Sequence, residues 1–531
     1  MRGFLAIGLL TLAAGSACTA DETTASTQAL TATQAHGKDV WFKETFGGEK
    51  FFSILAPNVL GLHLGLDVAL TSPRATRFTD WGLVNDPDCV QGNAQTGYLD
   101  YCPKDPGSAG VIGVRKKIIV GPNGPQVLIG VACASCHAGL DPANPPLNPN
   151  APAWENIHAT VGNQYINIAK LFSAHLPASD PRYQVFNTWA PGTVDTTAIE
   201  SDGINNPGII TQFFQVPDRP FFDLHDEGNP INVHRGGQGG EDDVGCEKAA
   251  LRVYFNIGMC AAECMLPHLT NGPGGTQTEI DDAECTARCP EYVRAKSEVG
   301  AMCDFMNTTT TPRLADAPGG TSHVDTSVLA RGKKVFDWNC AFCHSNGQSG
   351  TANVLSNDEI WPAGFIGTNI CRSLTTNWKE GQIWGQFSSD EYKARNATLL
   401  NPAGGGPGYY RNVPLLGIWA TAPFFHNNRL GGYNGDPSVA GRIAAYEDAM
   451  DQLLNPWKRD MLGSIQRTTA DVTLPNGTTL PAGTPIALFS NINPANGENL
   501  CPDLIENQGH YFGALLSSSD KRALTEYLKT K

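Results

Sequence analysis

The chain is poor in basic residues for its length. It carries 37 Lys and Arg against 52 Asp and Glu over 531 residues, which gives a formal net charge of −15. Because nucleic acids and anionic membrane surfaces attract positive charge, this balance argues against both as partners. A basic redox protein would suit a negative surface, and a simple solvated acidic surface is the alternative interpretation.

Long apolar runs are also missing. After residue 20, no stretch reaches the roughly 18 apolar residues that a membrane-spanning helix needs. A shorter apolar run, Phe4 to Ala14, follows Arg2 near the N-terminus. A run of this length behind a basic residue is typical of a secretory signal, which we place at residues 1–20. The protein is therefore expected to be exported, without a transmembrane span.

Cys18 lies in a segment that resembles a lipoprotein cleavage site. Gly15, however, stands where such sites usually carry Leu. A Ser- and Thr-rich polar tether over residues 21–38 suits either a lipid-anchored or a freely exported protein. We expect a periplasmic location, or an extracellular one anchored at the outer membrane, and a lipid anchor at Cys18 stays open.

Two five-residue motifs point to the chemistry of the chain: Cys133-Ala-Ser-Cys-His137 and Cys340-Ala-Phe-Cys-His344. In C-x-x-C-H, two thiols attach one haem and the adjacent imidazole binds its iron. Zinc, the main alternative, usually requires a second C-x-x-C or a His pair near each motif, and the sequence has neither. We therefore predict two covalently bound haem c groups, with His137 and His344 as iron ligands and Cys133, Cys136, Cys340 and Cys343 as attachment sites.

Of the 15 cysteines, an even ten remain when Cys18 and the four haem thiols are set aside. In an exported protein, such a set predicts a disulfide framework. The spacings Cys260-x3-Cys264 and Cys285-x3-Cys289 place two thiols on one face of each of two short helices. A metal site in this four-Cys cluster is the alternative. An antiparallel helix pair would join Cys260 to Cys289 and Cys264 to Cys285, and further plausible pairs, which the sequence alone leaves open, are Cys89–Cys102, Cys246–Cys303 and Cys371–Cys501.

Gly and Pro punctuation predicts the domain boundaries. The run Gly236–Asp243 is expected to be a flexible boundary, and a Thr-, Pro- and Gly-rich linker ends near residue 322. We expect a mainly α-helical fold with short β-hairpins, built from two cytochrome c-type haem domains at 39–243 and 323–531. Between them, residues 244–322 form a Cys-rich insert and linker. This insert is predicted to be a disulfide-linked helical hairpin that covers one face of the haem assembly.

Hydrophobic periodicity predicts individual elements. Val40–Leu60 and Ile166–His175 have helical spacing, whereas Lys116–Val120 and Gln126–Val131 flank a Gly-Pro-Asn-Gly turn typical of a hairpin. The second haem domain is expected to contain helices at Val328–Phe336 and Ser517–Thr530 and a hairpin formed by Thr468–Leu474 and Thr479–Leu488.

The segment Arg411–Asn427 contains Gly-Ile-Trp-Ala-Thr-Ala-Pro-Phe-Phe-His. Together with the haem motifs, it resembles the bacterial di-haem cytochrome c peroxidases, whose superfamily includes the maturation enzyme of methylamine dehydrogenase. The late Gly-His-Tyr-Phe-Gly at 509–513 is closer to the rubber-oxygenase-like branch. The resemblance covers both motifs, most of 324–531 and, more loosely, 204–228. It implies a haem-dependent oxidoreductase of the peroxidase or oxygenase type.

The resemblance also implies roles for single residues. Asn205, Thr421 and Pro423 match positions that in those peroxidases help to hold a calcium ion between the haems, the last two through backbone carbonyls. Oxygen ligands suit calcium, and an ordinary turn role is the alternative for Asn205. His426 matches a histidine near the haem interface, which we expect to make hydrogen bonds rather than bind iron. His137 and His426 are thus the candidate catalytic residues.

The second haem is expected to have two histidine ligands, His344 and His510, as in the rubber-oxygenase-like branch. Met450 is the alternative to His510, because it lies near the position where the peroxidases place a Met ligand.

The first haem, at His137, is expected to be the reactive one and to lack a permanent distal protein ligand. Some peroxidases block this haem with a His shortly before the Asn-x-Pro element, whereas residues 194–206 contain no His or Met. His158 and His175 are the alternative ligands. The Trp that lies between the haems of the peroxidases is replaced by Asp226 in the nearest alignment, so electrons take another route or need none.

Two functions are consistent with these features. In the first, the protein is a redox enzyme whose first haem reacts with peroxide or dioxygen while the second stores or transfers electrons. In the second, it is a non-catalytic periplasmic electron-transfer cytochrome with both irons six-coordinate. A haem-bearing binding module is a third interpretation, which rests on the Cys-rich insert alone. The partner is expected to be a redox protein or a small oxidant.

Overall fold

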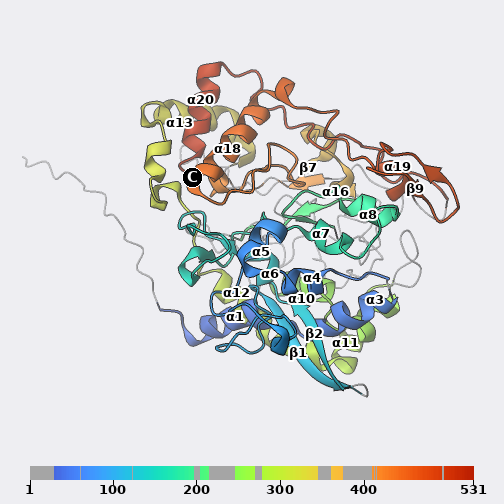
Figure 1. Ribbon diagram of the computed structural model, residues 1–531. Helices are drawn as coiled ribbons and strands as arrows, with labels where there is room; N and C mark the ends of the chain where they lie inside the picture. Colours follow the sequence, from blue (N-terminus) through green and yellow to red (C-terminus); the bar gives the residue numbers. More distant parts are fainter. Residues whose placement is uncertain are drawn as a thin grey trace, which may run out of the picture.

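The computed structural model shows a mainly helical chain whose described strands pair in two-stranded hairpins (Figure 1). The mainly α prediction with short hairpins is therefore confirmed. The predicted signal at 1–20, Cys18, the boundary at 236–243 and Asp226 lie outside the described residues. The structure describes residues 29–59, 61–121, 124–195, 204–213, 246–268, 278–344, 360–374, 409–411, 413, 415–492 and 496–531.

The N-terminal helix α1 (Ala32–Lys43) packs along α12 (Pro290–Met306) of the Cys-rich insert. Thr31 caps α1 in a capping box, which satisfies two backbone N–H groups at the helix start. Gly37 lies against the backbone of Ala301, where a Cβ atom would fall 1.8 Å from the carbonyl oxygen. A glycine at this position thus lets the two helices approach closely.

The first hairpin pairs β1 (Val114–Gly121) with β2 (Gly124–Val131), as predicted. It ends directly before the first haem motif, whose last four residues form α6 (Ala134–His137). Gly113, with φ +70°, lies so close to the backbone of Ser135 that any Cβ atom would clash. The hairpin therefore sets the position of α6.

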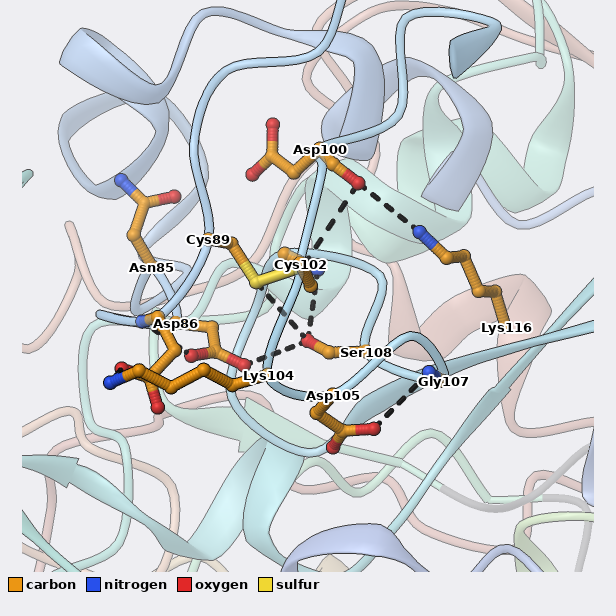
Figure 2. Close-up of a disulfide and its surroundings, with 12 residues drawn as sticks. Asn85, Asp86, Cys89, Asp100, Cys102, Lys104, Asp105, Gly107, Ser108 and Lys116 are labelled. Atoms are coloured by element: carbon orange, nitrogen blue, oxygen red, sulfur yellow. Dashed lines mark hydrogen bonds and ion pairs between the residues drawn. A yellow bond between two sulfur atoms is a disulfide. The ribbon is translucent and has the colours of Figure 1, made fainter.

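All five expected disulfides are present. In the insert, Cys260–Cys289 and Cys264–Cys285 join the π-helix Ala261–Met265 to α11 (Asp282–Arg288). Figure 2 shows Cys89–Cys102, beside which the Ser108 hydroxyl bonds to Asp86 at 2.8 Å. The other two pairs are Cys246–Cys303 and Cys371–Cys501.

The insert shares a core with the first haem motif. Helices α10 (Cys246–Asn256) and α12 contribute Tyr254 and Met302 to one buried cluster that also contains Trp41 and Ala134. Burying apolar area of this kind is the main source of folding free energy. The insert is therefore part of the packing around the first motif.

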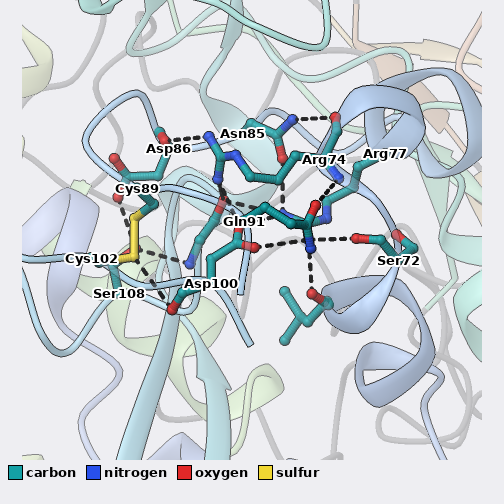
Figure 3. A network of polar contacts seen from close by, with 12 residues as sticks. Ser72, Arg74, Arg77, Asn85, Asp86, Cys89, Gln91, Asp100, Cys102 and Ser108 are labelled. Atoms are coloured by element: carbon teal, nitrogen blue, oxygen red, sulfur yellow. Dashed lines mark hydrogen bonds and ion pairs between the residues drawn. A yellow bond between two sulfur atoms is a disulfide. The ribbon is translucent and has the colours of Figure 1, made fainter. Parts of the chain in front are cut away.

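A buried ionic network joins α4 (Leu66–Thr71) and α5 (Arg74–Trp81) to the loop that carries Asp100 (Figure 3). Arg77 is fully buried and bonds to Asp100 at 2.7 Å and to the carbonyls of Leu70 and Ser72 at 2.8 Å each. Breaking such a buried pair typically costs about 3–5 kcal/mol. This network lies in the N-terminal part of the chain.

The C-terminal part is built around α13 (Leu329–Asn339) and α20 (Ser518–Leu528), which pack against each other. Gly332 of α13 lies against the backbone of Ala523 in α20. Figure 1 shows both helices near α18 (Val439–Leu454), at the end of the molecule opposite to α1 and α12. The second haem motif follows α13 directly and ends in α14 (Ala341–His344).

Some predicted boundaries were wrong. The helix expected over 40–60 is broken after Lys43, because Phe46 and Gly47 adopt positive φ values of 42° and 84°. The second hairpin is much shorter than expected, with β9 (Val472–Thr473) and β10 (Thr479–Leu480), and α19 (Ala487–Ser490) follows it. Helix α7 (Ile168–Ser173) lies inside its predicted range.

Further short elements complete the described structure. Strands pair as β3 (Gly139–Leu140) with β4 (Ile157–His158), β5 (Thr193–Val194) with β6 (Gly208–Ile209), and β7 (Ile360–Pro362) with β8 (Tyr409–Arg411). Further helices are α2 (Gly48–Lys50), α3 (Ala56–Val59), α8 (Pro181–Phe186), α15 (Ala363–Ile366) and α16 (Cys371–Leu374). Among the described residues no single helix is long and apolar enough to cross a membrane, although α10 and residues 261–268 pass that test jointly as a pair bent by 94°.

Candidate haem sites

The first site is formed by α6 and the segment after β6. His137 Nδ1 lies 2.9 Å from the backbone oxygen of Thr211. Because a carbonyl can only accept, Nδ1 carries the proton and Nε2 keeps a lone pair, which is the form of a metal-binding imidazole. Burial lowers the pKa of His137 to about 4, so the ring is neutral at neutral pH.

Aromatic rings fix the plane of His137. Phe213 stacks on the imidazole with a centroid distance of 4.7 Å and an interplanar angle of 29°. Trp41 lies 6.0 Å away, and its indole N–H donates to the carbonyl of Ala159 at 2.9 Å. The ring is thus held both by a hydrogen bond and by packing.

The second site repeats this arrangement. His344 Nδ1 lies 2.9 Å from the backbone oxygen of Val413, so its Nε2 also keeps a lone pair. The two accepting carbonyls lie 74 and 69 residues beyond their histidines. Burial lowers the pKa of His344 as well, which favours a neutral ring.

The four motif thiols are available for attachment. Among the described cysteines, Cys133, Cys136, Cys340 and Cys343 form no disulfide bond. Burial raises the pKa of the Cys133 and Cys340 thiols to about 12 each. Each pair lies one turn apart beside its histidine, as attachment of one haem edge requires.

His510 faces His344 at the second site. The two ring centroids lie 6.2 Å apart with an interplanar angle of 47°. Two imidazoles that bind one metal from opposite sides, through bonds of about 2 Å each, would have centroids about 6 Å apart. His510 is half-buried, its Nδ1 has no hydrogen-bond partner among the described residues, and burial lowers its pKa to about 4. These features fit an iron between His344 and His510.

Backbone geometry explains the Gly flank of His510. Gly509 has φ +81°, and a Cβ atom there would fall 2.1 Å from the backbone carbon of Gly367. His510 itself has φ +49°, and its N–H donates to the carbonyl of Ile366 at 2.8 Å. Met450, the alternative ligand, is a residue of α18 that packs in a hydrophobic core cluster, with an exposed fraction of 2%.

His426, which follows both motifs in the chain, is half-buried. Its ring stacks on Tyr410 with a centroid distance of 4.9 Å, and its Nε2 lies 3.3 Å from the Tyr410 hydroxyl. That hydroxyl donates to the carbonyl of Asn369 at 2.6 Å, so it can accept from His426. Burial, and then the charge of Arg372, lower the pKa of His426 to about 3.

Two of the three residues matched to a calcium site, Asn205 and Thr421, form hydrogen bonds within the protein. Asn205 Oδ1 accepts from the Trp189 indole at 2.8 Å, and Asn205 Nδ2 donates to Gln466 at 3.2 Å. The Thr421 hydroxyl donates to a carbonyl of its own turn at 3.3 Å, and Pro423 follows a cis peptide bond. Within the described ranges, no group of three or more His, Cys, Asp or Glu is arranged to hold a metal. The calcium site stays a prediction.

The alternative ligands for the first site are engaged elsewhere. His158 bonds to the carbonyl of Thr310 at 2.8 Å and accepts from the N–H of Thr160 at 3.2 Å. His175 bonds to Asp67 at 2.8 Å near the surface. Both histidines therefore have local structural partners.

Sequence reasoning missed a buried carboxyl group near His426. Asn427 donates to the Glu506 carboxylate at 2.8 Å, and burial raises the pKa of Glu506 to about 7. A lone Glu in an irregular segment gives no pattern that would have indicated this contact.

No family model and no curated protein matches the chain.

Proposed function

We propose that the protein is an exported di-haem c-type cytochrome that acts as a peroxidase- or oxygenase-like redox enzyme. The observation that carries the proposal is the difference between the two sites. His344 faces a second imidazole, that of His510, at 6.2 Å. The imidazole of His137 lies beside the aromatic rings of Phe213 and Trp41.

This difference assigns a role to each site. Two strong axial ligands suit electron transfer with little reorganisation, whereas catalysis needs an axial position that a small oxidant can reach. A bound haem supplies the redox-active iron and its coordination positions. The second site is therefore the electron store or relay, and the site at His137 is the place where peroxide or dioxygen reacts.

The residues of the chain tune both sites. The hydrogen bonds from His137 to Thr211 and from His344 to Val413 hold each ring in one tautomer and raise its basicity as a ligand. Their low pKa values keep both imidazoles neutral and ready to bind iron.

A short piece of backbone links the two sites. The N–H of Ile209 donates to the carbonyl of His426 at 2.7 Å, and the carbonyl of Thr211, two residues later, accepts from His137. His426 therefore acts as a positioning residue at the interface of the sites. A calcium ion held by Asn205, Thr421 and Pro423 is part of the proposal, since one lone pair of the Asn205 oxygen is not used by Trp189.

The proposed location is outside the cytoplasm. Five disulfides favour an oxidising compartment, and a secretory signal at residues 1–20 would direct the chain to one. The net charge of −15 suits a basic redox partner, and a lipid anchor at Cys18 would hold the protein at a membrane surface.

Carbon monoxide titration of the reduced protein tests the proposal, because carbon monoxide binds ferrous iron only where an axial position is accessible. We expect one carbon monoxide per protein, and His510→Ala should raise the stoichiometry to two. His137→Ala should abolish turnover with peroxide. Two low-spin haems that bind no carbon monoxide would instead establish the electron-transfer cytochrome.

A further inference from the structure

The side chain of Arg459 donates hydrogen bonds to the backbone directly before His510. The guanidinium is buried, with an exposed fraction of 6% for the residue. Its Nη1 donates to the carbonyls of Asn507 at 3.0 Å and Gly509 at 2.7 Å. Its Nε and Nη2 donate to two carbonyls at the end of α18, those of Gln452 at 2.8 Å and Leu453 at 3.1 Å.

The peptide unit before His510 is therefore held at both ends. The carbonyl oxygen of Gly509 accepts a hydrogen bond from Arg459, and the N–H of His510 donates one to the carbonyl of Ile366. Both Gly509 and His510 have positive φ, a conformation that a residue with a side chain rarely adopts without support. The hydrogen bonds of Arg459 supply that support from the rigid end of α18.

Packing reinforces the same connection. The guanidinium lies 5.6 Å from the ring centroid of Phe425 and 5.4 Å from that of Tyr511. The ring of Phe425 in turn lies 6.4 Å from the imidazole of His510. Cation–π contacts of this kind favour a fixed position of the guanidinium. Arg459 is thus linked to His510 in two indirect ways, through the backbone of Gly509 and through the ring of Phe425.

Among the described residues, neutral groups surround the charge of Arg459. Its four hydrogen-bond acceptors are neutral carbonyl oxygens, and no described residue forms an ion pair with it. Arginine stays protonated in proteins. A fixed positive charge near a metal disfavours the oxidised, more positive state of that metal.

We infer that Arg459 is a positioning residue that holds His510 in place as an axial ligand and raises the reduction potential of the second haem. The inference rests on the proposed function, in which His344 and His510 bind one iron. One side chain thus affects both the position of His510 and the reduction potential, and substitutions of Arg459 can separate these two effects. Lys keeps the charge and loses the planar fork, whereas Gln loses the charge.

The test uses the full-length haem-loaded protein, with absorption and EPR spectra and a spectroelectrochemical titration. Arg459→Lys and Arg459→Gln should both raise the high-spin fraction of the second haem, and added imidazole should restore the low-spin signal. Of the two, Arg459→Gln should show the larger fall in midpoint potential. Arg77→Lys is the matched control, because Arg77 is a buried arginine that also bonds to carbonyls, far along the chain from His510. It should lower stability and leave the spin state and potential of the second haem unchanged.

His510→Ala separates the two possible failures. If this variant keeps a low-spin second haem, the proposed ligand pair is wrong. If His510→Ala becomes high-spin while both Arg459 variants keep the wild-type spin state and potential, the inference about Arg459 is overturned. Should neither Arg459 variant accumulate, Phe425→Leu removes the aromatic contact between Arg459 and His510. An unchanged spectrum of this variant would also overturn the inference, and a raised high-spin fraction would support it.

Discussion

The imidazole of His510 lies across from that of His344, with the ring centroids 6.2 Å apart, although 166 residues separate them in the chain. A hydrogen bond to the carbonyl of Val413 fixes His344, and the Gly509–His510 peptide is held by Ile366 and Arg459. Two rings placed independently by the fold therefore meet at the distance that one shared metal ion requires.

The ligand pair can be tested against Met450. We expect His510→Ala to convert the second haem from low-spin to high-spin, as measured by EPR. Met450→Ala should leave the spin state unchanged and lower the free energy of unfolding by about 2–5 kcal/mol, because it removes a buried core side chain. The reverse pattern, in which Met450→Ala alone changes the spin state, would assign the ligand to Met450.

Local patterns predicted much of the fold. The turn residues between Lys116–Val120 and Gln126–Val131 marked a hairpin that is present. The i, i+4 thiols in the insert predicted two disulfides that form as expected. The helices α13 and α20 lie close to their predicted ranges, since each carries a clear apolar face.

Features that depend on contacts across the chain were not predictable. Phe46 and Gly47 break a segment whose aromatic spacing favoured one long helix. The carbonyls of Thr211 and Val413 carry no sequence signal, because any residue supplies a backbone oxygen. Arg459 is another such case, since its partners are carbonyls chosen by tertiary packing.

The contact between α13 and α20 predicts the effect of a single methyl group. A Cβ atom on Gly332 would lie 2.0 Å from the carbonyl oxygen of Ala523, so Gly332→Ala forces the helices apart. We expect a loss of about 1–3 kcal/mol in the free energy of unfolding, measured by chemical denaturation. Gly364→Ala is the control, because no atom lies within 4 Å of its added Cβ. Equal stability of the two variants would contradict the close packing.

Loop length predicts which disulfide stabilises the protein most. Cys371–Cys501 closes a separation of 130 residues, whereas Cys89–Cys102 closes one of 13. By chain entropy, their removal should cost about 5 and about 3 kcal/mol respectively. We expect the double Cys→Ser variant of the first pair to unfold at the lower denaturant concentration.

Mass mapping without reduction should recover all five pairs, and free thiols at these positions would contradict the framework.

The buried carboxyl group of Glu506 predicts a pH dependence of stability. Burial raises its pKa from 4.5 to about 7, although Arg429 and the hydrogen bond from Asn427 act in the opposite direction. The folded protein therefore binds more protons here than the unfolded chain between these pH values. This contribution to stability is fully present below pH 4.5 and is lost as the pH rises through about 7.

Glu506→Gln should remove this dependence, because Gln stays neutral and keeps a similar shape. Relative to this variant, the wild-type protein should lose about 3 kcal/mol in the free energy of unfolding over that range, measured by denaturant titration at several pH values. Glu498→Gln, an exposed position in the same C-terminal region, should keep the wild-type profile. If wild type and Glu506→Gln lose stability in parallel, the carboxyl group of Glu506 is ionised in the folded protein and the buried contact with Asn427 does not hold it neutral.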